Sequence, residues 1–181
     1  MKIIDLSQTL ENGMPVYPGD PKVKIEQIHN LNKEGWRLRL LSFGSHTGSH
    51  VDAPAHMDEG GQTLDQLSIG KFIGKARVVS VEENFPLNTG LVFSSGKIDV
   101  ALFDKVVAVK PLFVGVGNEA ELTVEMEQRL LRHGIITFTD LVNLEKLPPD
   151  KDFTFYGVPL KIKDGDGSPI RAFAVVQWFV N

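Results

Sequence analysis

Apolar and polar positions alternate most clearly in the stretch WRLRLLSF at residues 36–43. One face of this stretch carries a tryptophan and two leucines, and the other carries two arginines, a period of two that predicts a half-buried strand. The stretch KVKIEQI at residues 22–28 repeats the alternation. We therefore expect a strand in each, and we expect Trp36 and the chain's other tryptophan, Trp178, to lie in the core.

Runs that are rich in β-branched residues predict further strands along the chain. A short run lies near the start at 2–6, and longer ones occupy residues 75–81, 105–117 and 134–139. The C-terminal part reads as a hairpin, with strands at 153–162 and 170–178 around the turn KDGDGSP.

One segment, LTVEMEQRLLRHG at residues 122–134, has the pattern of a helix. Thr123 is suited to cap it, acidic residues fill its first turns, and Gly134 follows its basic end. Because strands outnumber helices, we expect an α/β or α+β fold with a mixed sheet and few helices, in a single domain spanning residues 1–181.

Composition and charge narrow the choice of partners. The chain is 42% hydrophobic and 23% charged, as in soluble globular proteins, and its net charge is −4 without a basic run. This argues against nucleic acid or an anionic membrane as a partner, because both attract clustered lysine and arginine. No apolar run has the length of a membrane span or follows a basic start like a signal peptide, so we expect a cytoplasmic protein.

The chain has no cysteine, which excludes disulfides and thiolate zinc sites. Any bound metal ion must therefore use histidine, aspartate or glutamate.

Three of the five histidines, and one aspartate, fall within GSHTGSHVDAPAHM at residues 44–57. In an extended chain His46, His50, Asp52 and His56 would share one face, and small residues would occupy the other. Residues four apart on a strand are separated by roughly 13 Å. The first histidine can therefore join the second and the aspartate only if the chain bends at the intervening Thr-Gly pair.

Two imidazoles and a carboxylate are the usual first ligands of a catalytic zinc or manganese ion, which lowers the pKa of a bound water to about 7. His56, past a rigid proline, is free to act as general acid or base. The alternative is a solvated turn in which histidines gather by chance. The density of ionisable residues within eleven positions favours the metal site.

HTGSHVDAPAH closely resembles the H-x-G-T-H-x-D-x-P-x-H signature of the cyclase and kynurenine formamidase family of metal-dependent hydrolases, with one serine in place of threonine. DLSQTLENGMPVYPGD near the start and VPLKIKDGDGSPIRAFAVV near the end also resemble that family. The resemblance implies a swivelling β/β/α domain, usually a homodimer or larger. It also implies hydrolysis of a C–N amide-type bond in a small molecule, as in N-formylkynurenine, with one or two divalent ions.

The resemblance carries site residues over by position. It implies that His46, His50 and Asp52 bind metal, zinc or alternatively manganese, and that His56 donates and accepts the proton. It also places Tyr17 where kynurenine formamidases tend to hold a tryptophan against the substrate.

Two later ligand positions of the family, a histidine and a glutamate, correspond here to Glu127 and Thr139. Threonine is a poor ligand, but Glu127 lies in the apolar stripe of the predicted helix, where an inward carboxylate needs a partner. We include Glu127 as a candidate ligand, with a glutamate that reaches water from the stripe edge as the alternative. These departures motivate a second hypothesis, a catalytically impaired module that binds one ion without turnover.

The acidic pair in KDGDGSP, Asp164 and Asp166, has two interpretations. The carboxylates suit a cation, but the glycines and their place between two predicted strands favour a hairpin turn.

Overall fold

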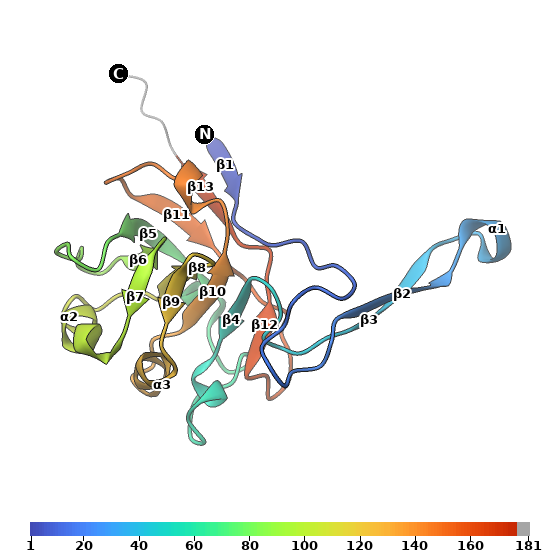
Figure 1. Cartoon of the computed structure of the whole chain (residues 1–181), viewed down its shortest axis with the longest axis horizontal. Helices are drawn as coiled ribbons and strands as arrows, with labels where there is room; N and C mark the ends of the chain where they lie inside the picture. The colour runs from blue at the N-terminus through green and yellow to red at the C-terminus, as the bar shows by residue number, and fades with distance from the viewer. Residues whose placement is uncertain (177–181) are drawn as a thin grey trace.

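A nine-stranded mixed sheet runs through the body of the protein in the computed structural model, which describes residues 1–176 (Figure 1). In sheet order the strands are β1 (Lys2–Asp5), β13 (Phe173–Val176), β11 (Phe153–Tyr156), β5 (Ile73–Val79), β6 (Gly90–Phe93), β8 (Val114–Gly117), β10 (Thr137–Leu141), β4 (His50–Asp52) and β12 (Gly167–Pro169). The four central strands, β5, β6, β8 and β10, run parallel to one another, and the other pairings in this sheet are antiparallel.

The remaining elements are two small sheets and short helices. The small sheets pair β2 (Lys24–His29) with β3 (Leu38–Ser42), and β7 (Gly96–Ile98) with β9 (Ala120–Leu122). The α-helices are α1 (Leu31–Glu34), α2 (Phe103–Ala108) and α3 (Val124–Arg132). Single 3₁₀ turns occupy Pro54–His56, Ile69–Phe72, Val100–Leu102 and Leu144–Lys146. The expected mixed sheet with few helices is confirmed.

Apolar side chains of the sheet alternate between two core clusters. Leu91 and Phe93 of β6 pack with residues of α2 and α3, whereas Val92 between them belongs to the cluster on the other face. Figure 1 shows α2 and α3 together on one side of the body. The predicted helix is confirmed, since the Thr123 hydroxyl accepts a hydrogen bond from the Met126 amide at 3.3 Å.

Three expectations about the chain are wrong. The strand predicted within 36–43 forms as β3, but it is exposed along its whole length and not half-buried. Residues 105–108, predicted as strand, belong to helix α2, because burial of Val106 against the sheet outweighs the preference of β-branched residues for strands. Trp36 is 57% exposed and lies outside the core. The position predicted for Trp178 falls outside the described residues.

The C-terminal hairpin is confirmed in part. β11 and β13 pair antiparallel, but the segment between them also forms β12, which pairs with β4 at the opposite edge of the sheet. That pairing places the end of KDGDGSP beside the histidine segment. None of the helices within residues 1–176 has both the length and the apolar character needed to cross a membrane.

Candidate metal and catalytic site

The histidine segment follows β3 and bends before it becomes a strand. β3 ends at Ser42, and Gly48 then adopts a left-handed conformation with φ of 60°. A Cβ atom at this position would lie 2.9 Å from Leu10 Cδ2, so the space and the turn both favour glycine. The predicted bend between His46 and His50 is therefore present.

Strand β4 is held by neighbours on both sides. On β10, Thr137 lies opposite Asp52 and Thr139 lies opposite His50, while on β12 Gly167 lies opposite Asp52. The histidine and the aspartate of β4 are only 9% and 1% exposed. Residues of the alternate face are buried as well: Thr47, Ser49, Val51 and Ala53.

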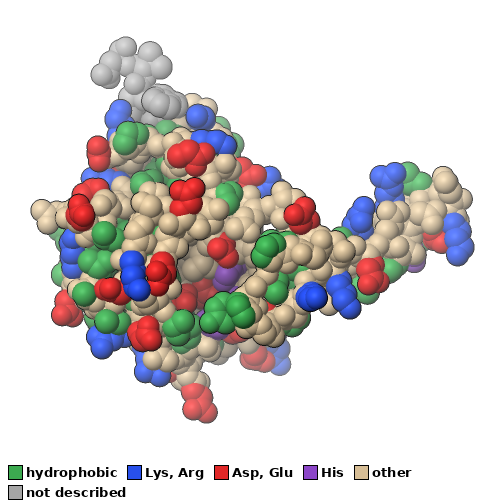
Figure 2. Space-filling view, in the orientation of Figure 1, with side chains coloured by type: hydrophobic (Ala, Val, Ile, Leu, Met, Phe, Trp, Pro, Cys, Tyr) green, Lys and Arg blue, Asp and Glu red, His purple; other side chains and the backbone are tan. Residues whose placement is uncertain are grey.

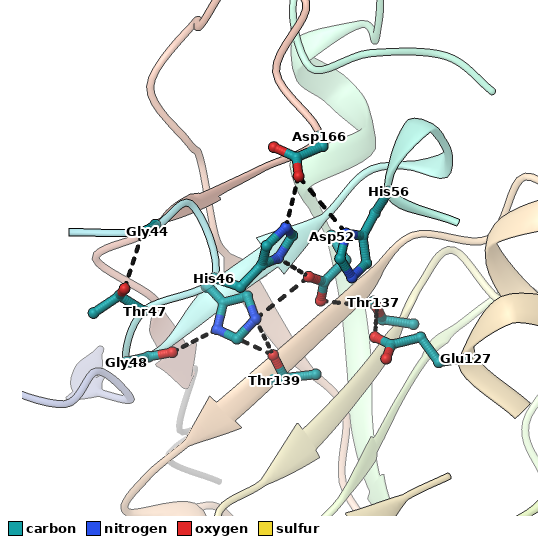
Figure 3. A network of polar contacts seen from close by, with 11 residues as sticks. Gly44, His46, Thr47, Gly48, Asp52, His56, Glu127, Thr137, Thr139 and Asp166 are labelled. Carbon is teal, nitrogen blue, oxygen red and sulfur yellow. Dashed lines mark hydrogen bonds and ion pairs between the residues drawn. The ribbon is translucent and has the colours of Figure 1, made fainter. Parts of the chain in front are cut away.

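His46, His50 and Asp52 converge on one point, with one potential ligand atom of each within 4.8 Å of the others. Figure 3 shows His46 and Asp52 within this network of polar contacts. Nδ1 of His46 lies 2.6 Å from Oδ1 of Asp52, and Nε2 of His50 lies 3.3 Å from the same oxygen. Two imidazole nitrogens and a carboxylate oxygen suit Zn²⁺ or Mn²⁺. The three residues therefore fit a divalent ion.

The orientation of His50 is set by the backbone. Its Nδ1–H donates a hydrogen bond to the Gly48 carbonyl oxygen at 2.6 Å. With Nδ1 engaged as a donor, Nε2 is the ring nitrogen that faces Asp52 and that would offer a lone pair to an ion. The Thr139 hydroxyl lies 2.9 Å from the same Nε2, so Thr139 contacts a candidate ligand directly.

Charge at the site is balanced between buried carboxylate and imidazole. Burial raises the pKa of Asp52, but the neighbouring His50 and His46 outweigh it and hold that pKa well below its usual range. Burial lowers the pKa of His46, yet its bonds to Asp52 and Asp166 raise it to about 9. In the metal-free protein His46 is therefore an imidazolium, with both ring nitrogens donating to carboxylates.

His56 lies in the 3₁₀ turn after Pro54 and stacks beside His46, with 3.9 Å between the ring centroids. Burial and the charge of His46 lower its pKa, against the opposing effect of Asp52 and Asp166. A neutral imidazole beside the candidate ligands is able to accept a proton at neutral pH.

Asp166 belongs to the site, which the sequence interpretation missed. Its Oδ2 accepts a hydrogen bond from His46 Nε2 at 2.9 Å and lies 3.7 Å from His56 Nδ1, while its backbone carbonyl accepts from the Ala53 amide at 2.8 Å. The turn expected in KDGDGSP is present at Asp164, but three residues later the chain enters β12, beside the histidine segment. The pairing of β12 with β4 was not evident from the sequence.

Glu127 is linked to Asp52 through the hydroxyl group of Thr137. Thr137 Oγ1 lies 2.9 Å from Oε1 of Glu127 and 3.1 Å from Oδ2 of Asp52. Burial and the charge of Asp52 raise the pKa of Glu127 to about 7, although Thr137 and the histidines oppose this rise. A threonine has a single hydroxyl hydrogen, so a protonated Glu127 completes the chain by donating to Thr137, which donates to Asp52. Glu127 as a metal ligand stays a prediction.

Tyr17 lies apart from this network. It is 69% exposed and occupies the loop before β2. Its predicted contact with substrate stays a prediction.

Known proteins resemble this chain over most of its length. A family model described as putative cyclase matches residues 4–112. A kynurenine formamidase of Salinibacter ruber is 31% identical, covering 95% of this chain and 96% of the relative, and one of Bacillus cereus is 29% identical, covering 93% and 95%.

Solved structures share the fold. Isatin hydrolase A from Ralstonia solanacearum superposes with a TM-score of 0.80 at 22% identity, covering 97% of this chain and 92% of that one. A predicted metal-dependent hydrolase from Bacillus stearothermophilus gives a TM-score of 0.78 at 20% identity, covering 96% and 97%.

Proposed function

Because this chain belongs to the putative cyclase family, we propose that it is a metal-dependent hydrolase that cleaves a C–N amide-type bond of a small molecule. The convergence of His46, His50 and Asp52 beside His56 carries this proposal. The kynurenine formamidase relatives make aryl formamides such as N-formylkynurenine the first substrates to test. The isatin hydrolase fold relatives add cyclic amides.

His46 Nδ1, His50 Nε2 and an Asp52 oxygen would hold the ion, since these atoms face a common point. When bound, a divalent ion supplies Lewis-acid polarisation of the scissile carbonyl and acidifies a water molecule. We favour zinc over manganese for its preference for imidazole ligands, and either suits the donor set.

His56 would move the proton. Its neutral ring takes the proton from the attacking water and passes it to the departing nitrogen, so the C–N bond breaks without expelling an amide anion. The amide is converted to an acid and an amine, and the imidazole returns to its neutral form.

Asp166 would position both histidines. A metal-binding histidine commonly donates its second ring N–H to a carboxylate, and His46 Nε2–H meets Asp166 in this way. The same carboxylate lies within 3.7 Å of His56 Nδ1, where it favours the tautomer whose Nε2 is free to accept a proton.

One observation favours the alternative of a metal-binding module without turnover. Thr139 stands where the family resemblance places a glutamate ligand, and it faces His50. The alternative predicts one tightly bound ion and no hydrolysis. Homo-oligomeric assembly and a cytoplasmic location also stay predictions.

Substitution of His56 in the metal-loaded protein tests the proposal. We expect His56→Ala to lower kcat on its best substrate by roughly 10²–10⁴-fold while bound metal is unchanged. The substrate panel contains N-formylkynurenine, simple aryl formamides and cyclic amides, and His133→Ala is the matched control because His133 lies outside the site. Undiminished kcat in His56→Ala would refute the role of His56. A loaded protein that is inert toward the whole panel supports the binding module.

A further inference from the structure

The ring nitrogen of His46 that does not face Asp52 belongs to a second cluster of metal-binding side chains. The members of this cluster are His46, His56 and Asp166, with one potential ligand atom of each within 4.8 Å of the others. Oδ2 of Asp166 lies 2.9 Å from Nε2 of His46 and 3.7 Å from Nδ1 of His56. Figure 3 shows Asp166 with dashed lines to two imidazole rings. The cluster thus offers nitrogen and oxygen donors that the first site leaves unused.

This cluster also lies apart from Glu127, the other candidate ligand. Glu127 is linked through a hydroxyl group to Oδ2 of Asp52. His46 meets Oδ1 of the same carboxylate through Nδ1, and it meets Asp166 through Nε2. An ion held by Asp166 would therefore be distinct from any ion held between Asp52 and Glu127.

Solvent reaches the second cluster more easily than the first site. The side chains of His56 and Asp166 are 28% and 46% exposed, whereas those of His50 and Asp52 are 11% and 2% exposed. Figure 2 shows histidine side chains in a hollow of the body, with acidic side chains nearby. An ion from solution can therefore reach this cluster directly.

An ion would bind this cluster more weakly than the first site. When His46 offers Nδ1 to an ion in the first site, its remaining proton lies on Nε2 and is donated to Asp166. Nε2 becomes a ligand of a second ion only if that proton is lost. Until then the second ion has two protein ligands, Nδ1 of His56 and a carboxylate oxygen of Asp166, and water completes its coordination.

We propose that His56 and Asp166, together with Nε2 of His46, form a second and weaker site for Zn²⁺, and that an ion bound there inhibits hydrolysis. The imidazole nitrogens and the carboxylate oxygen suit this ion. The inhibition rests on the proposed hydrolase function, whereas the site itself does not. Metal binding and turnover therefore test the two parts of the proposal separately.

The chemistry of imidazole explains the inhibition. The two nitrogens of a neutral ring share one proton, so only one of them offers a lone pair. An ion bound at Nδ1 of His56 leaves the ring proton on Nε2, and the ring then cannot accept a proton from the attacking water. Excess metal would remove the general base in this way while the first ion stays in place.

The donor set predicts which ions inhibit. Imidazole binds Zn²⁺ more tightly than Mn²⁺, and Mg²⁺ prefers oxygen ligands. Excess Zn²⁺ should therefore inhibit at a lower concentration than excess Mn²⁺, and excess Mg²⁺ should not inhibit.

Calorimetric titration of the chelator-treated chain with Zn²⁺, in a background of excess Mg²⁺, tests the site without any substrate. We expect two binding steps, the second roughly 100-fold weaker than the first because it has fewer ligands. His56→Ala and Asp166→Asn should each remove the second step and keep the first, since asparagine retains the acceptor for His46 but is a poor zinc ligand. The control His133→Ala lies outside both clusters and should keep both steps.

Turnover at rising Zn²⁺ concentration measures the inhibition. We expect kcat of the wild-type protein to fall as the second binding step saturates. Asp166→Asn should keep its own kcat at the Zn²⁺ concentration that halves the wild-type value.

A single binding step in the wild-type chain overturns the proposed site, and so does a second step that persists in both His56→Ala and Asp166→Asn. Turnover that is unaffected while the second step saturates overturns the inhibition. A chain that binds two ions as described and hydrolyses nothing supports the site and refutes the proposed function, so the two failures are distinguishable.

Discussion

Asp166 contacts two histidines of the candidate site, and this single carboxylate links a metal ligand to the proposed acid–base group. It also explains why His46 can present Nδ1 to the site, because Nε2 is already engaged. Bonds of this kind fix the ring of a ligand and raise its basicity, so their loss weakens the metal site without removing a ligand.

We predict that Asp166→Ala lowers metal affinity by roughly 10–100-fold, whereas Asp166→Asn, which retains an acceptor oxygen, has a smaller effect. Competition with a chromophoric chelator measures the dissociation constants directly. Asp164→Asn, in the neighbouring turn, is the matched control and should bind metal like the wild-type protein. Equal affinity in Asp166→Ala and wild type would show that Asp166 does not support the ligand.

Among the secondary-structure elements, β4 shows what the sequence could predict. Positions 46, 50, 52 and 56 are all even, and Thr-Gly lies between the first two, so the sequence indicated a bent segment with its ionisable side chains on one face. The bend at Gly48 and the buried small residues of the other face agree with this prediction. Such features depend on neighbours in the sequence. The helix α3 was predictable for the same reason, since its cap and amphipathic pattern are local.

Features that depend on distant partners were not predictable. Asp166 reaches the site because β12 pairs with β4, and nothing in KDGDGSP specifies that partner. The same applies to α2. Its β-branched residues prefer a strand, but packing of Val106 in the core favours the helix. Exposure of β2 and β3 likewise could not be read from their alternating pattern, because alternation marks an apolar face without saying what lies against it.

At the scale of the whole molecule, metal and protons compete for the same groups. The pKa of His46 is raised from its usual 6.5 to about 9 in the metal-free protein. This shift stabilises the fold below pH 6.5, and the stabilisation is lost as the pH rises through 9. The pKa of Glu127 is raised to about 7, so its contribution to stability is also present at low pH and is lost as the pH rises through 7. The pKa of Asp52 is lowered, so its contribution to stability is present near neutral pH and is lost only in acid.

We therefore predict that the thermal midpoint of the metal-free protein falls by roughly 5–10 °C between pH 6.5 and 9. The metal-saturated protein should show a growing stabilisation over the same range, because protons no longer compete with the ion. Differential scanning calorimetry of both forms measures this, and His46→Asn should flatten the metal-free trend. A midpoint of the metal-free protein that rises with pH in this range would contradict the assigned charge state of His46.

The central claim is that His46, His50 and Asp52 hold the ion on which C–N hydrolysis depends. Its most direct test is turnover measured against bound metal, starting from chelator-treated protein and adding Zn²⁺ or Mn²⁺ in steps. We predict no turnover without metal, a rise in proportion to the ion bound, and loss of both binding and turnover in His50→Ala. Full turnover by the metal-free protein, or wild-type turnover by His50→Ala, would contradict the account.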